Sequence, residues 1–364
     1  MQTLTQDKNI QSPSTIRIFQ KLNCYLCGNP GQVIFSGLQD RLYGIQGVWG
    51  LRECDNKQCQ LVWLDPTPVE SELSKAYLNY YTHQLITKSV SFQLRQRVKR
   101  GVAGLICGYQ RTTGFFEKLM AVPFLFTPFL RENMIATGCG YLDGQTRGKL
   151  LEIGCGSGMT LANLKSLGWD AEGIDFDSKA AESANLNFNI TVKSGSLREV
   201  NYEANKFDAI LMSHVIEHIF DPVIFLTECS RILKPGGKLV ILTPNINSIG
   251  FKRFSRNWVH LDPPRHLYLF SIQTLRAIAI KAGFFPTSWK TTVRDSNLSW
   301  LMSMEISKFG KWDSSKKLGL WRKIQAKIFQ VVALMKLYRN SDSGDEIVLT
   351  LIKPVNSYDN FVKS

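Results

Sequence analysis

The sequence "LLEIGCGSGMT", Leu150 to Thr160, joins an apolar run to a turn that holds three glycines. A short apolar strand, a glycine-rich turn and a following helix form the ligand-binding unit of many α/β domains. A phosphate-binding loop requires the pattern G-x4-G-K-[ST], and no Lys-Ser or Lys-Thr pair closes this turn. The dinucleotide-binding pattern G-x-G-x-x-G is also absent, because Gly158 lies one residue before the position of the third glycine in that pattern. The glycines alone therefore leave the ligand open.

Glu152, two residues before the first glycine, distinguishes between the remaining ligands. A carboxylate at the end of the strand repels a pyrophosphate, but it suits a ligand that carries an ammonium group and no phosphate. S-adenosylmethionine (SAM) is such a ligand, with a sulfonium, an amino-acid end, a ribose and an adenine. Asp175 ends the next apolar segment, where a carboxylate accepts the ribose hydroxyls of NAD and SAM alike, so it discriminates weakly. Glu152 therefore indicates SAM and disfavours an NAD-dependent oxidoreductase, the alternative enzyme class.

From residue 149 onward, short apolar segments alternate with segments of helical pattern. The predicted strands span 149–155, 170–176, 190–195, 206–215, 238–245, 287–293 and 346–354. The predicted helices between them span 159–168, 178–188, 222–237 and 271–283. Continuous apolar strands that alternate with helices indicate an α/β fold with a parallel sheet covered on both faces. Ligands of such sheets bind beyond the carboxyl ends of the strands, which is where the glycine turn is expected.

Two pairs of cysteines near the N-terminus have the spacing of a metal site. Cys24 and Cys27 form C-x2-C, and Cys54 and Cys59 form C-x4-C after a gap of 26 residues. Two such pairs can close a tetrahedral Zn²⁺ site, and sites with four sulfur ligands are structural rather than catalytic. The segment is too short for a core of its own, so the metal would supply its folding energy; free buried thiols are the alternative. The other cysteines, Cys107, Cys139, Cys155 and Cys229, have apolar neighbours and are expected to be core residues.

Composition divides the chain into segments. We predict a flexible tail at 1–20, a zinc-ribbon-like module at 21–66, a helical linker or lid at 67–145, an α/β domain at 146–355 and a tail at 356–364. The first 20 residues lack the pattern of a secretory signal. The longest apolar stretches fall short of the roughly 20 residues that span a bilayer. Eight cysteines without such a signal indicate a reducing compartment. We therefore expect a cytoplasmic protein that contacts the inner face of the membrane at most peripherally.

The net charge of +14 is unevenly distributed. No acidic residue occurs between Glu72 and Glu117, and an insertion at 308–339 is rich in Lys and Arg. The predicted helix in this insertion has the apolar positions Leu320, Trp321, Ile324, Ile328, Val331, Val332 and Met335. Such a basic amphipathic helix either lies on an anionic membrane surface or packs onto the protein's own core, and we favour packing. A zinc-ribbon nucleic-acid-binding protein is a further alternative, disfavoured because the basic residues are not concentrated in the ribbon.

Four motifs make the chain resemble a known family. "LLEIGCGSG", "GIDFD", "FDAILMSHVIEHIFDP" and "RILKPGGKLVILTPN", in this order, resemble the class I SAM-dependent methyltransferases between about Lys149 and Gly283. The cysteine segment that ends in "LVWLDPTP", followed later by "DPPRHLYLFS", is similar to a bacterial branch of that family with an N-terminal four-cysteine ribbon. "HVIEHIFDP" also resembles the ubiquinone-pathway O-methyltransferases. The resemblance implies a Rossmann-like domain with a mostly parallel seven-stranded sheet whose last strand is antiparallel, beside a small zinc-ribbon-like module.

The resemblance also implies which residues bind SAM. The implied contacts are Glu152, Gly154, Cys155, Gly156 and Gly158 for the methionine end, Asp175 for the ribose, Phe176, Ser196 and Leu197 for the adenine, and Ser213 and His214 beside the sulfonium or the acceptor. Members of the family often carry an acid after the third strand that binds the adenine amino group. Here Ser196 offers a hydroxyl near that position, so this hydroxyl and the Leu197 amide are expected to take over adenine recognition.

Methyl transfer to a hydroxyl needs a base, and histidine suits that role near neutral pH. His266 is the best candidate base, followed by His260 and His214. The alternative for each is a histidine that only holds a loop. In the ubiquinone-pathway likeness, Glu217 and His218 would hold a divalent ion.

The acceptor is expected to be a small molecule, a sugar or a lipid-linked intermediate, methylated at a hydroxyl oxygen. Arg265 is expected to bind a substrate carboxylate or phosphate, or to pair with a local acid such as Asp262. A protein that binds SAM without performing chemistry is the remaining alternative.

Overall fold

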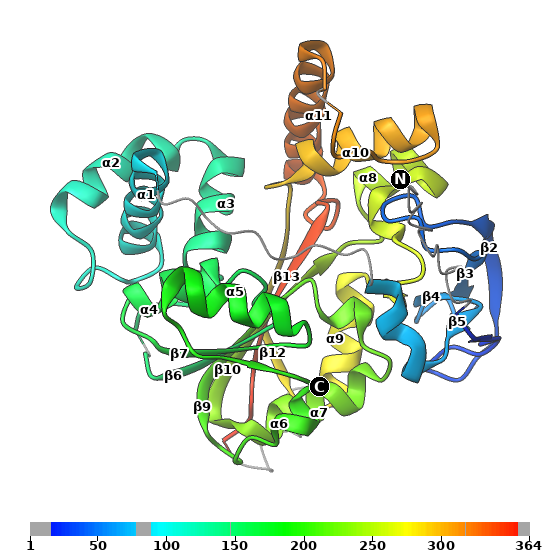
Figure 1. Cartoon of the computed structure of the whole chain (residues 1–364), viewed down its shortest axis with the longest axis horizontal. Helices are drawn as coiled ribbons and strands as arrows, with labels where there is room; N and C mark the ends of the chain where they lie inside the picture. Colours follow the sequence, from blue (N-terminus) through cyan, green and yellow to red (C-terminus); the bar gives the residue numbers. More distant parts are fainter. Residues whose placement is uncertain (1–15, 78–88, 146, 317, 356–364) are drawn as a thin grey trace, which may run out of the picture.

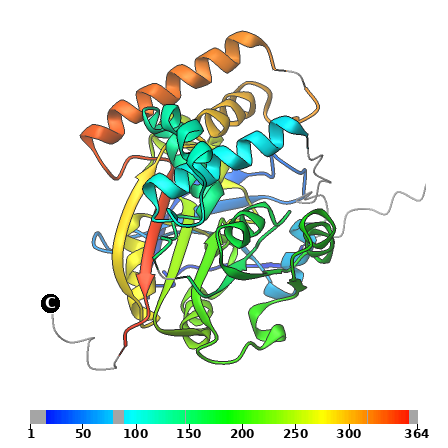
Figure 2. The ribbon, with the colours of Figure 1, turned by 90° about the vertical axis from the view of Figure 1, so that its left-hand side faces the viewer.

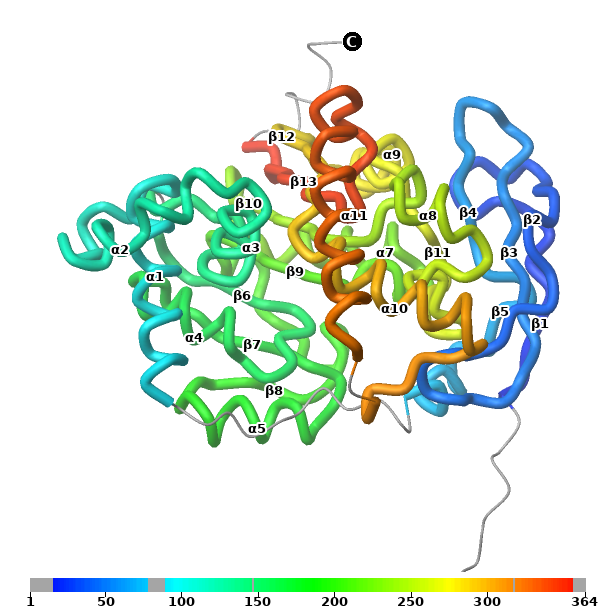
Figure 3. Tube along the Cα trace, turned by 90° about the horizontal axis from the view of Figure 1, so that it is seen from above, coloured from blue at the N-terminus to red at the C-terminus, as the bar shows by residue number. Residues whose placement is uncertain are grey.

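The computed structural model describes residues 16–77, 89–145, 147–316 and 318–355. Residues 1–15 of the predicted N-terminal tail and the whole predicted tail 356–364 lie outside these ranges. Figure 1 shows a central sheet with a helical segment on one side and the cysteine-bearing module on the other. Figure 3, seen from above, shows the same order across the molecule.

A seven-stranded sheet lies at the centre of the molecule, in the order β12-β13-β10-β9-β6-β7-β8. Its strands are β6 (Lys149–Ile153), β7 (Asp170–Asp175), β8 (Val192–Ser194), β9 (Phe207–Ser213), β10 (Leu233–Pro244), β12 (Phe285–Thr292) and β13 (Glu346–Ile352). The strands from β6 to β10 run parallel, whereas β13 is antiparallel to both β10 and β12. This arrangement confirms the predicted sheet with its antiparallel last strand. The strand order reverses between β6 and β9, which is where α/β sheets bind their ligands.

Alternate side chains of the central strands face opposite sides of the sheet and pack into separate cores. In β9, Ile210 and Met212 join one core, while Ala209 and Leu211 join the other. The same alternation occurs in β10 and β13. The strands therefore bury both of their faces, as their continuous apolar sequences predicted.

Helices cover both faces of this sheet. The helices that follow β6 in the chain are α4 (Met159–Ser166), α5 (Ser178–Phe188), α6 (Leu197–Val200), α7 (Pro222–Ile232), α8 (Ile249–Phe254), α9 (Ile272–Lys281), α10 (Ser296–Phe309) and α11 (Leu320–Arg339), with the 3-10 turns η2 (Ile216–His218), η3 (Ser255–Asn257) and η4 (Val259–Leu261). The predicted helix 222–237 is too long, because it ends at Ile232 and Leu233 already belongs to β10. Pro235 has no amide hydrogen to donate to a helix, and Gly236 has a φ of +76°, so the chain leaves the helix before both.

Three helices precede the sheet: α1 (Val90–Ile106), α2 (Phe115–Leu125) and α3 (Pro128–Cys139). Val98 and Val102 of α1 and Ile135 of α3 pack into the same core as Leu164 of α4. This segment therefore covers one face of the sheet and is more than a linker, while its action as a lid remains a prediction. At the start of the predicted helical linker 67–145, the chain forms a 3-10 helix, η1 (Glu70–Tyr77).

The N-terminal module contains two small sheets. Its strands are β1 (Ile18–Phe19), β2 (Gly31–Leu38), β3 (Trp49–Cys54), β4 (Val62–Leu64) and β5 (Thr67–Pro68). The larger sheet has the order β11-β4-β3-β2, and β11 (Tyr268–Leu269) comes from the α/β domain. Tyr268 pairs with Trp63 across this junction. The module thus completes its sheet with a strand from much later in the chain and shares one core with the α/β domain.

The predicted insertion at 308–339 consists mainly of α11. Lys308 lies in the last turn of α10, which begins well before the insertion. Figure 2 shows α11 running along the outer edge of the molecule. Among the helices of the described ranges, none is both long enough and apolar enough to cross a membrane.

Candidate functional site

The glycine turn between β6 and α4 has a left-handed backbone at each of its glycines. The angle φ is +68° at Gly154, +51° at Gly156 and +74° at Gly158. A Cβ atom at Gly154 would lie 2.6 Å from Cγ2 of Val215, and one at Gly158 would lie 2.7 Å from Cβ of Ala184. A Cβ atom at Gly156 would have no neighbour within 4 Å. The outer glycines are thus needed for close packing, and the middle one leaves the backbone open to a ligand.

Glu152, next to the last residue of β6, is buried, with 5 % of its surface exposed. Its Oε2 atom has no hydrogen-bond partner among the described residues. Burial, together with the nearby carboxylate of Asp175, raises the pKa of Glu152 to about 8. A buried carboxylate oxygen without a partner is costly unless a cation pairs with it. This site therefore fits the ammonium group of an amino-acid ligand.

Asp175, the last residue of β7, lies beside the same turn. Its Oδ2 accepts the backbone N–H of Gly156 at 2.8 Å, and its Oδ1 accepts the N–H of Asp177 at 3.0 Å. Burial raises the pKa of Asp175, and these backbone hydrogen bonds partly oppose the shift. A carboxylate oxygen has more than one lone pair, so Asp175 can fix the turn and still accept ligand hydroxyls.

Phe176 follows Asp175 and is exposed, and its ring packs edge-on against Tyr77 of η1, with the ring centroids 4.9 Å apart. The sequence did not single out Tyr77, because no local pattern indicates that η1 reaches the glycine turn. Cys155 is buried, and a Cβ atom at Gly173 would lie 2.8 Å from its Sγ. The Cys155 side chain thus points into the core, and its backbone is the part that can meet a ligand.

Ser196 is the N-cap of α6. Its hydroxyl accepts the N–H of Glu199 at 3.3 Å, and its own N–H donates to the Glu199 carboxylate at 2.7 Å. Leu197 is buried. The hydroxyl thus serves a capping box. Adenine recognition by Ser196 and Leu197 remains a prediction.

Beyond β9, four ionisable side chains form a row in which negative and positive charges alternate: Glu217, His214, Glu346 and Arg294. His214 directly follows Ser213 and has a φ of +55°. Its Nδ1 lies 3.2 Å from Glu217 and its Nε2 lies 3.0 Å from Glu346. Arg294 donates two hydrogen bonds to Glu346, each of 2.6 Å. Burial lowers the pKa of His214, but hydrogen bonds to the two carboxylates outweigh this effect and raise the pKa to about 10. His214 is therefore a cation at neutral pH.

The two carboxylates of this row, Glu217 and Glu346, are also ionised at neutral pH. Burial raises the pKa of Glu217, but its contact with His214 outweighs burial and lowers the pKa to about 2. Arg294 and His214 likewise lower the pKa of Glu346 against the effect of burial. Neither Glu346 nor Arg294 was among the predicted site residues. The antiparallel register of β13, which pairs Glu346 with Pro244, brings Glu346 to the site, and no sequence motif marks that register.

Three more histidines lie next to this row of four charged side chains. The rings of His218 and His266 meet edge-on with their centroids 4.7 Å apart, and His260 stacks against His214 at 6.3 Å. Burial lowers the pKa of His218 to about 4 and that of His260 to about 3, so both are neutral. Nδ1 of His266 lies 2.7 Å from the carbonyl oxygen of His260, to which it can only donate, so a neutral His266 keeps a lone pair on Nε2. The fold thus gathers the four histidines that the sequence assigned to the acceptor side.

Glu217, His218 and His266 each offer one ligand atom, and these atoms lie within 4.8 Å of one another. Two imidazoles and a carboxylate can hold a divalent cation. The predicted pair Glu217 and His218 therefore has a third potential ligand in His266, which the sequence assigned to proton transfer instead.

Arg265 is fully buried. Its guanidinium donates two hydrogen bonds of 2.8 Å to Asp40 of the cysteine module, and its Nε donates to Asp262 at 3.0 Å. Burial lowers the pKa of Arg265, but the two carboxylates outweigh it and raise the pKa. The predicted pairing with Asp262 is thus present. Arg265 also ties the module to the segment that carries His266.

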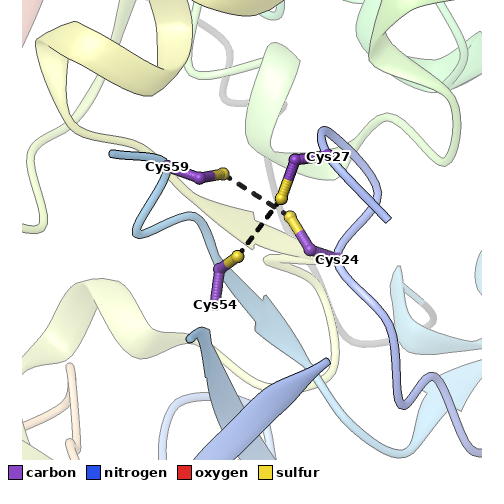
Figure 4. Close-up of side chains that lie close together, drawn as sticks. All are labelled: Cys24, Cys27, Cys54 and Cys59. Atoms are coloured by element: carbon purple, nitrogen blue, oxygen red, sulfur yellow. Dashed lines mark hydrogen bonds between the residues drawn. The ribbon is translucent and has the colours of Figure 1, made fainter. Parts of the chain in front are cut away.

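The four predicted cysteine ligands meet in the module, as Figure 4 shows. Sγ of Cys24 lies 3.6 Å from Sγ of Cys59, and Sγ of Cys27 lies 3.4 Å from Sγ of Cys54. All four sulfur atoms lie within 4.8 Å of one another. Four sulfur ligands about 2.3 Å from a tetrahedral Zn²⁺ ion are about 3.8 Å apart, so the cluster has the dimensions of such a site.

A cavity of about 420 Å³ lies between the module and the segment that follows β10. Phe35, Val62, Ile246 and Phe251 contribute apolar walls. None of the cofactor residues or histidines described above lines this cavity, so it is separate from the candidate active site.

Known proteins resemble the central part of the chain. A family model described as "Methyltransferase domain" matches residues 129–288. The ubiquinone biosynthesis O-methyltransferase of Cereibacter sphaeroides strain KD131 is 30 % identical over 167 residues, which cover 43 % of this chain and 67 % of the relative. The mitochondrial ubiquinone biosynthesis O-methyltransferase of Mus musculus is 33 % identical over 149 residues, which cover 38 % of this chain. The chain spans 40 % of the length of this mitochondrial relative.

Solved structures resemble the chain more remotely. The crystal structure of a SAM-dependent methyltransferase from Archaeoglobus fulgidus aligns with 66 % of this chain and 100 % of that chain, with 21 % sequence identity and a TM-score of 0.40.

Proposed function

The chain belongs to the class I SAM-dependent methyltransferases, and from this premise we propose that it transfers the methyl group of SAM to a hydroxyl oxygen of a small-molecule, sugar or lipid-linked acceptor. The observation that carries SAM binding is the buried Glu152, whose Oε2 lacks a partner beside the open backbone of Gly156. A pyrophosphate carries no cation that could pair with this carboxyl group. The likeness to two O-methyltransferases supports oxygen as the accepting atom.

The residues at the carboxyl edge of β6 and β7 hold the donor. Glu152 pairs with the ammonium group, Asp175 accepts the ribose hydroxyls, and Phe176 with Tyr77 flanks the adenine. When bound, SAM supplies an electrophilic methyl group on its sulfonium. The protein then has to align the acceptor oxygen with that group and to exclude water from it.

His266 is the base that the geometry supports best. Its Nδ1–H donates to the carbonyl of His260, so its Nε2 can take the proton of the acceptor hydroxyl. Nε2 lies 3.9 Å from the carboxylate of Asp262, which stabilises the protonated ring that forms. His260 comes second, because its Nε2 is engaged with the Ser299 hydroxyl at 2.8 Å. His214 comes last, because a residue that is already a cation cannot accept a proton.

A divalent cation held by Glu217, His218 and His266 is the second proposal for this cluster, supported by the distances between the three ligand atoms. In that case Nε2 or Nδ1 of His266 is a ligand and cannot serve as the base. Chelation separates the two proposals. Activity that survives EDTA supports His266 as the base, whereas activity that EDTA abolishes and Mg²⁺ restores supports the cation.

The four cysteines are proposed to bind a structural Zn²⁺ ion, on the strength of their sulfur-to-sulfur distances. Four thiolate ligands leave no open position for a substrate, so the ion would stabilise the fold and take no part in the chemistry. Through β4 and its pairing with β11, the ion would also stabilise the segment that carries His266.

Two experiments test this function. In a thermal-shift titration, we expect SAM to raise the melting temperature at concentrations at least about tenfold below those of NAD. The reverse preference would overturn SAM as the donor. The acceptor is found by incubating a cell extract with the protein and methyl-labelled SAM, followed by mass spectrometry. A label on oxygen supports the proposed reaction, and a label on nitrogen or carbon overturns the assignment of the accepting atom.

A further inference from the structure

The outward face of α11 is apolar. Its exposed residues Leu320, Trp321, Ile324, Ile328, Val331, Val332, Met335 and Tyr338 leave between 36 % and 77 % of their surfaces in solvent. At 100° per residue they occupy one arc of about 120° along the whole helix. The helix packs against the protein with the opposite side, where Ala326, Gln330 and Ala333 are buried. The expectation that the predicted apolar face packs onto the protein's own core is therefore wrong, because α11 has two apolar faces and packs with the other one.

A second exposed apolar face lies on the neighbouring helical segment. On α2 and its C-cap, Phe115, Phe116, Leu119, Val122 and Phe126 are exposed and again fall on one side of the helix. Nζ of Lys327 on α11 lies 5.3 Å from the ring centroid of Phe129 on α3, so α11 contacts this helical segment through α3. Figure 1 shows α2 and α11 on the same, upper side of the sheet. Contiguous exposed apolar faces of this kind mark interaction sites on proteins.

The charge around the α11 face has one sign. Residues 308–339 contain nine Lys or Arg and a single acidic residue, Asp313. Arg322 is paired with Glu305, whereas Lys323 and Lys336 are exposed on the two flanks of the apolar arc and Arg339 is exposed at its C-terminal end. An exposed apolar arc flanked by cations is complementary to a surface with acyl chains below a layer of negative headgroups. A protein partner of ordinary composition offers no such layered pattern.

We propose that α11, together with the exposed face of α2, docks this protein onto an anionic phospholipid bilayer. The helix lies in the plane of the interface with its apolar arc among the upper acyl chains, while Lys323, Lys336 and Arg339 contact phosphate groups. Docking does not depend on methyl transfer. Its consequence, that the acceptor is presented to the enzyme at the membrane surface, rests on the proposed function.

Vesicle flotation tests the docking. Full-length protein is mixed with vesicles of phosphatidylcholine alone or with a quarter of phosphatidylglycerol, and the bound fraction is measured at low and at high salt. We expect at least about tenfold stronger binding to the anionic vesicles at low salt, and a clear decrease at high salt. The double variant Ile328→Glu/Met335→Glu should lose this binding, and Lys323→Glu/Lys336→Glu should weaken it by about tenfold or more.

The matched control places two glutamates on the cysteine module, as Val33→Glu/Val48→Glu, at valines of similar exposure. This control should bind vesicles like the wild type. SAM binding, measured by calorimetry without vesicles, should be unchanged in every variant. That readout shows that each variant is folded, and it separates a failure of docking from a failure of the proposed function.

Three results would overturn the proposal. The first is wild-type protein that floats with neither kind of vesicle. The second is anionic binding that Ile328→Glu/Met335→Glu leaves intact. The third is a stable dimer in the absence of lipid that this same variant dissociates, because the apolar face would then be the contact between two copies of the chain.

Discussion

The donor half and the acceptor half of the candidate site are built in different ways. The donor half, Glu152, Gly154, Gly156 and Asp175, comes from the adjacent strands β6 and β7 and the glycine turn that follows β6. The acceptor half, His214, Glu217, His266, Arg294 and Glu346, comes from segments spread over more than a third of the chain. Its position also depends on the cysteine module, through β11 and the buried pair of Arg265 and Asp40. Because of this difference, we expect some substitutions to impair methyl transfer while SAM binding stays intact.

Loss of the metal should produce the largest difference between the two halves, because it should impair methyl transfer far more than SAM binding. Structural Zn²⁺ contributes about 10–16 kcal/mol of apparent binding free energy in zinc-finger peptides, so Cys54→Ser should unfold the module. We expect about one zinc ion per wild-type chain and almost none in the variant, by elemental analysis. Methyl transfer should fall by at least about 100-fold, while SAM affinity changes by less than about threefold. Cys107→Ser, outside the cluster, should keep its zinc.

Two outcomes would contradict this separation. Full zinc content in Cys54→Ser would exclude the four-cysteine site. A loss of SAM affinity as large as the loss of activity would mean that the donor half depends on the module as well.

His266→Gln should disable only the acceptor half. Removal of a general base costs about 10²–10⁴-fold in rate, so we expect kcat to fall in this range while the KM for SAM stays the same. The matched variant His260→Gln should lose less than about tenfold. Steady-state kinetics with a saturating acceptor measures both. A larger loss in His260→Gln than in His266→Gln would move the role of base to His260.

Arg265→Met should loosen the junction between the module and the acceptor half. It leaves Asp40 and Asp262 without their buried partner, and breaking a buried ion pair costs about 3–5 kcal/mol. The free energy of unfolding from denaturant titration should fall by about this amount. The exposed Arg198→Met is the control, with an expected change within about 0.5 kcal/mol. A loss below about 1 kcal/mol for Arg265→Met would show that the pair does not hold the junction.

The two halves should also respond to pH in different ranges. Glu152 has a pKa raised from 4.5 to about 8, so the folded state keeps its proton longer than the unfolded chain does. Its contribution to stability is complete below pH 4.5 and is lost as the pH rises to about 8. His214 has a pKa raised from 6.5 to about 10, so its contribution is complete below pH 6.5 and is lost as the pH rises to about 10.

Unfolding titrations without ligand check this difference. The gap in unfolding free energy between wild type and Glu152→Gln should change mainly between pH 5 and 8. The gap between wild type and His214→Asn should change mainly between pH 7 and 10. Two gaps that change over the same range would contradict the separate environments of the two residues.

Much of the fold and the donor half could be predicted because their signals are local. The strand, glycine turn and helix around Glu152 occupy consecutive residues, and the alternation of apolar segments indicated the sheet. The spacing of the cysteine pairs likewise predicted a cluster that the fold assembles. In each case the residues that act together also lie close together in the sequence or in one repeated pattern.

The acceptor half and the module junction could not be predicted in the same way. Glu346 and Arg294 reach His214 through the register of β13 and the following contacts, which no motif encodes. The two-residue strand β11 is too short to leave a periodic pattern, although it joins two parts of the molecule. The periodicity of α11 revealed an apolar face, but periodicity alone does not say which of two apolar faces packs.

The central claim is that Glu152 makes the glycine turn a site for SAM. Isothermal titration calorimetry of SAM with wild type, Glu152→Gln and the exposed control Glu203→Gln tests it most directly. We predict that Glu152→Gln binds SAM at least about tenfold more weakly, because the variant loses a charged hydrogen bond to the ammonium group. Glu203→Gln should bind like the wild type, and NAD should compete with SAM in none of the three. Equal affinity of wild type and Glu152→Gln for SAM, or tighter binding of NAD than of SAM, would contradict the account.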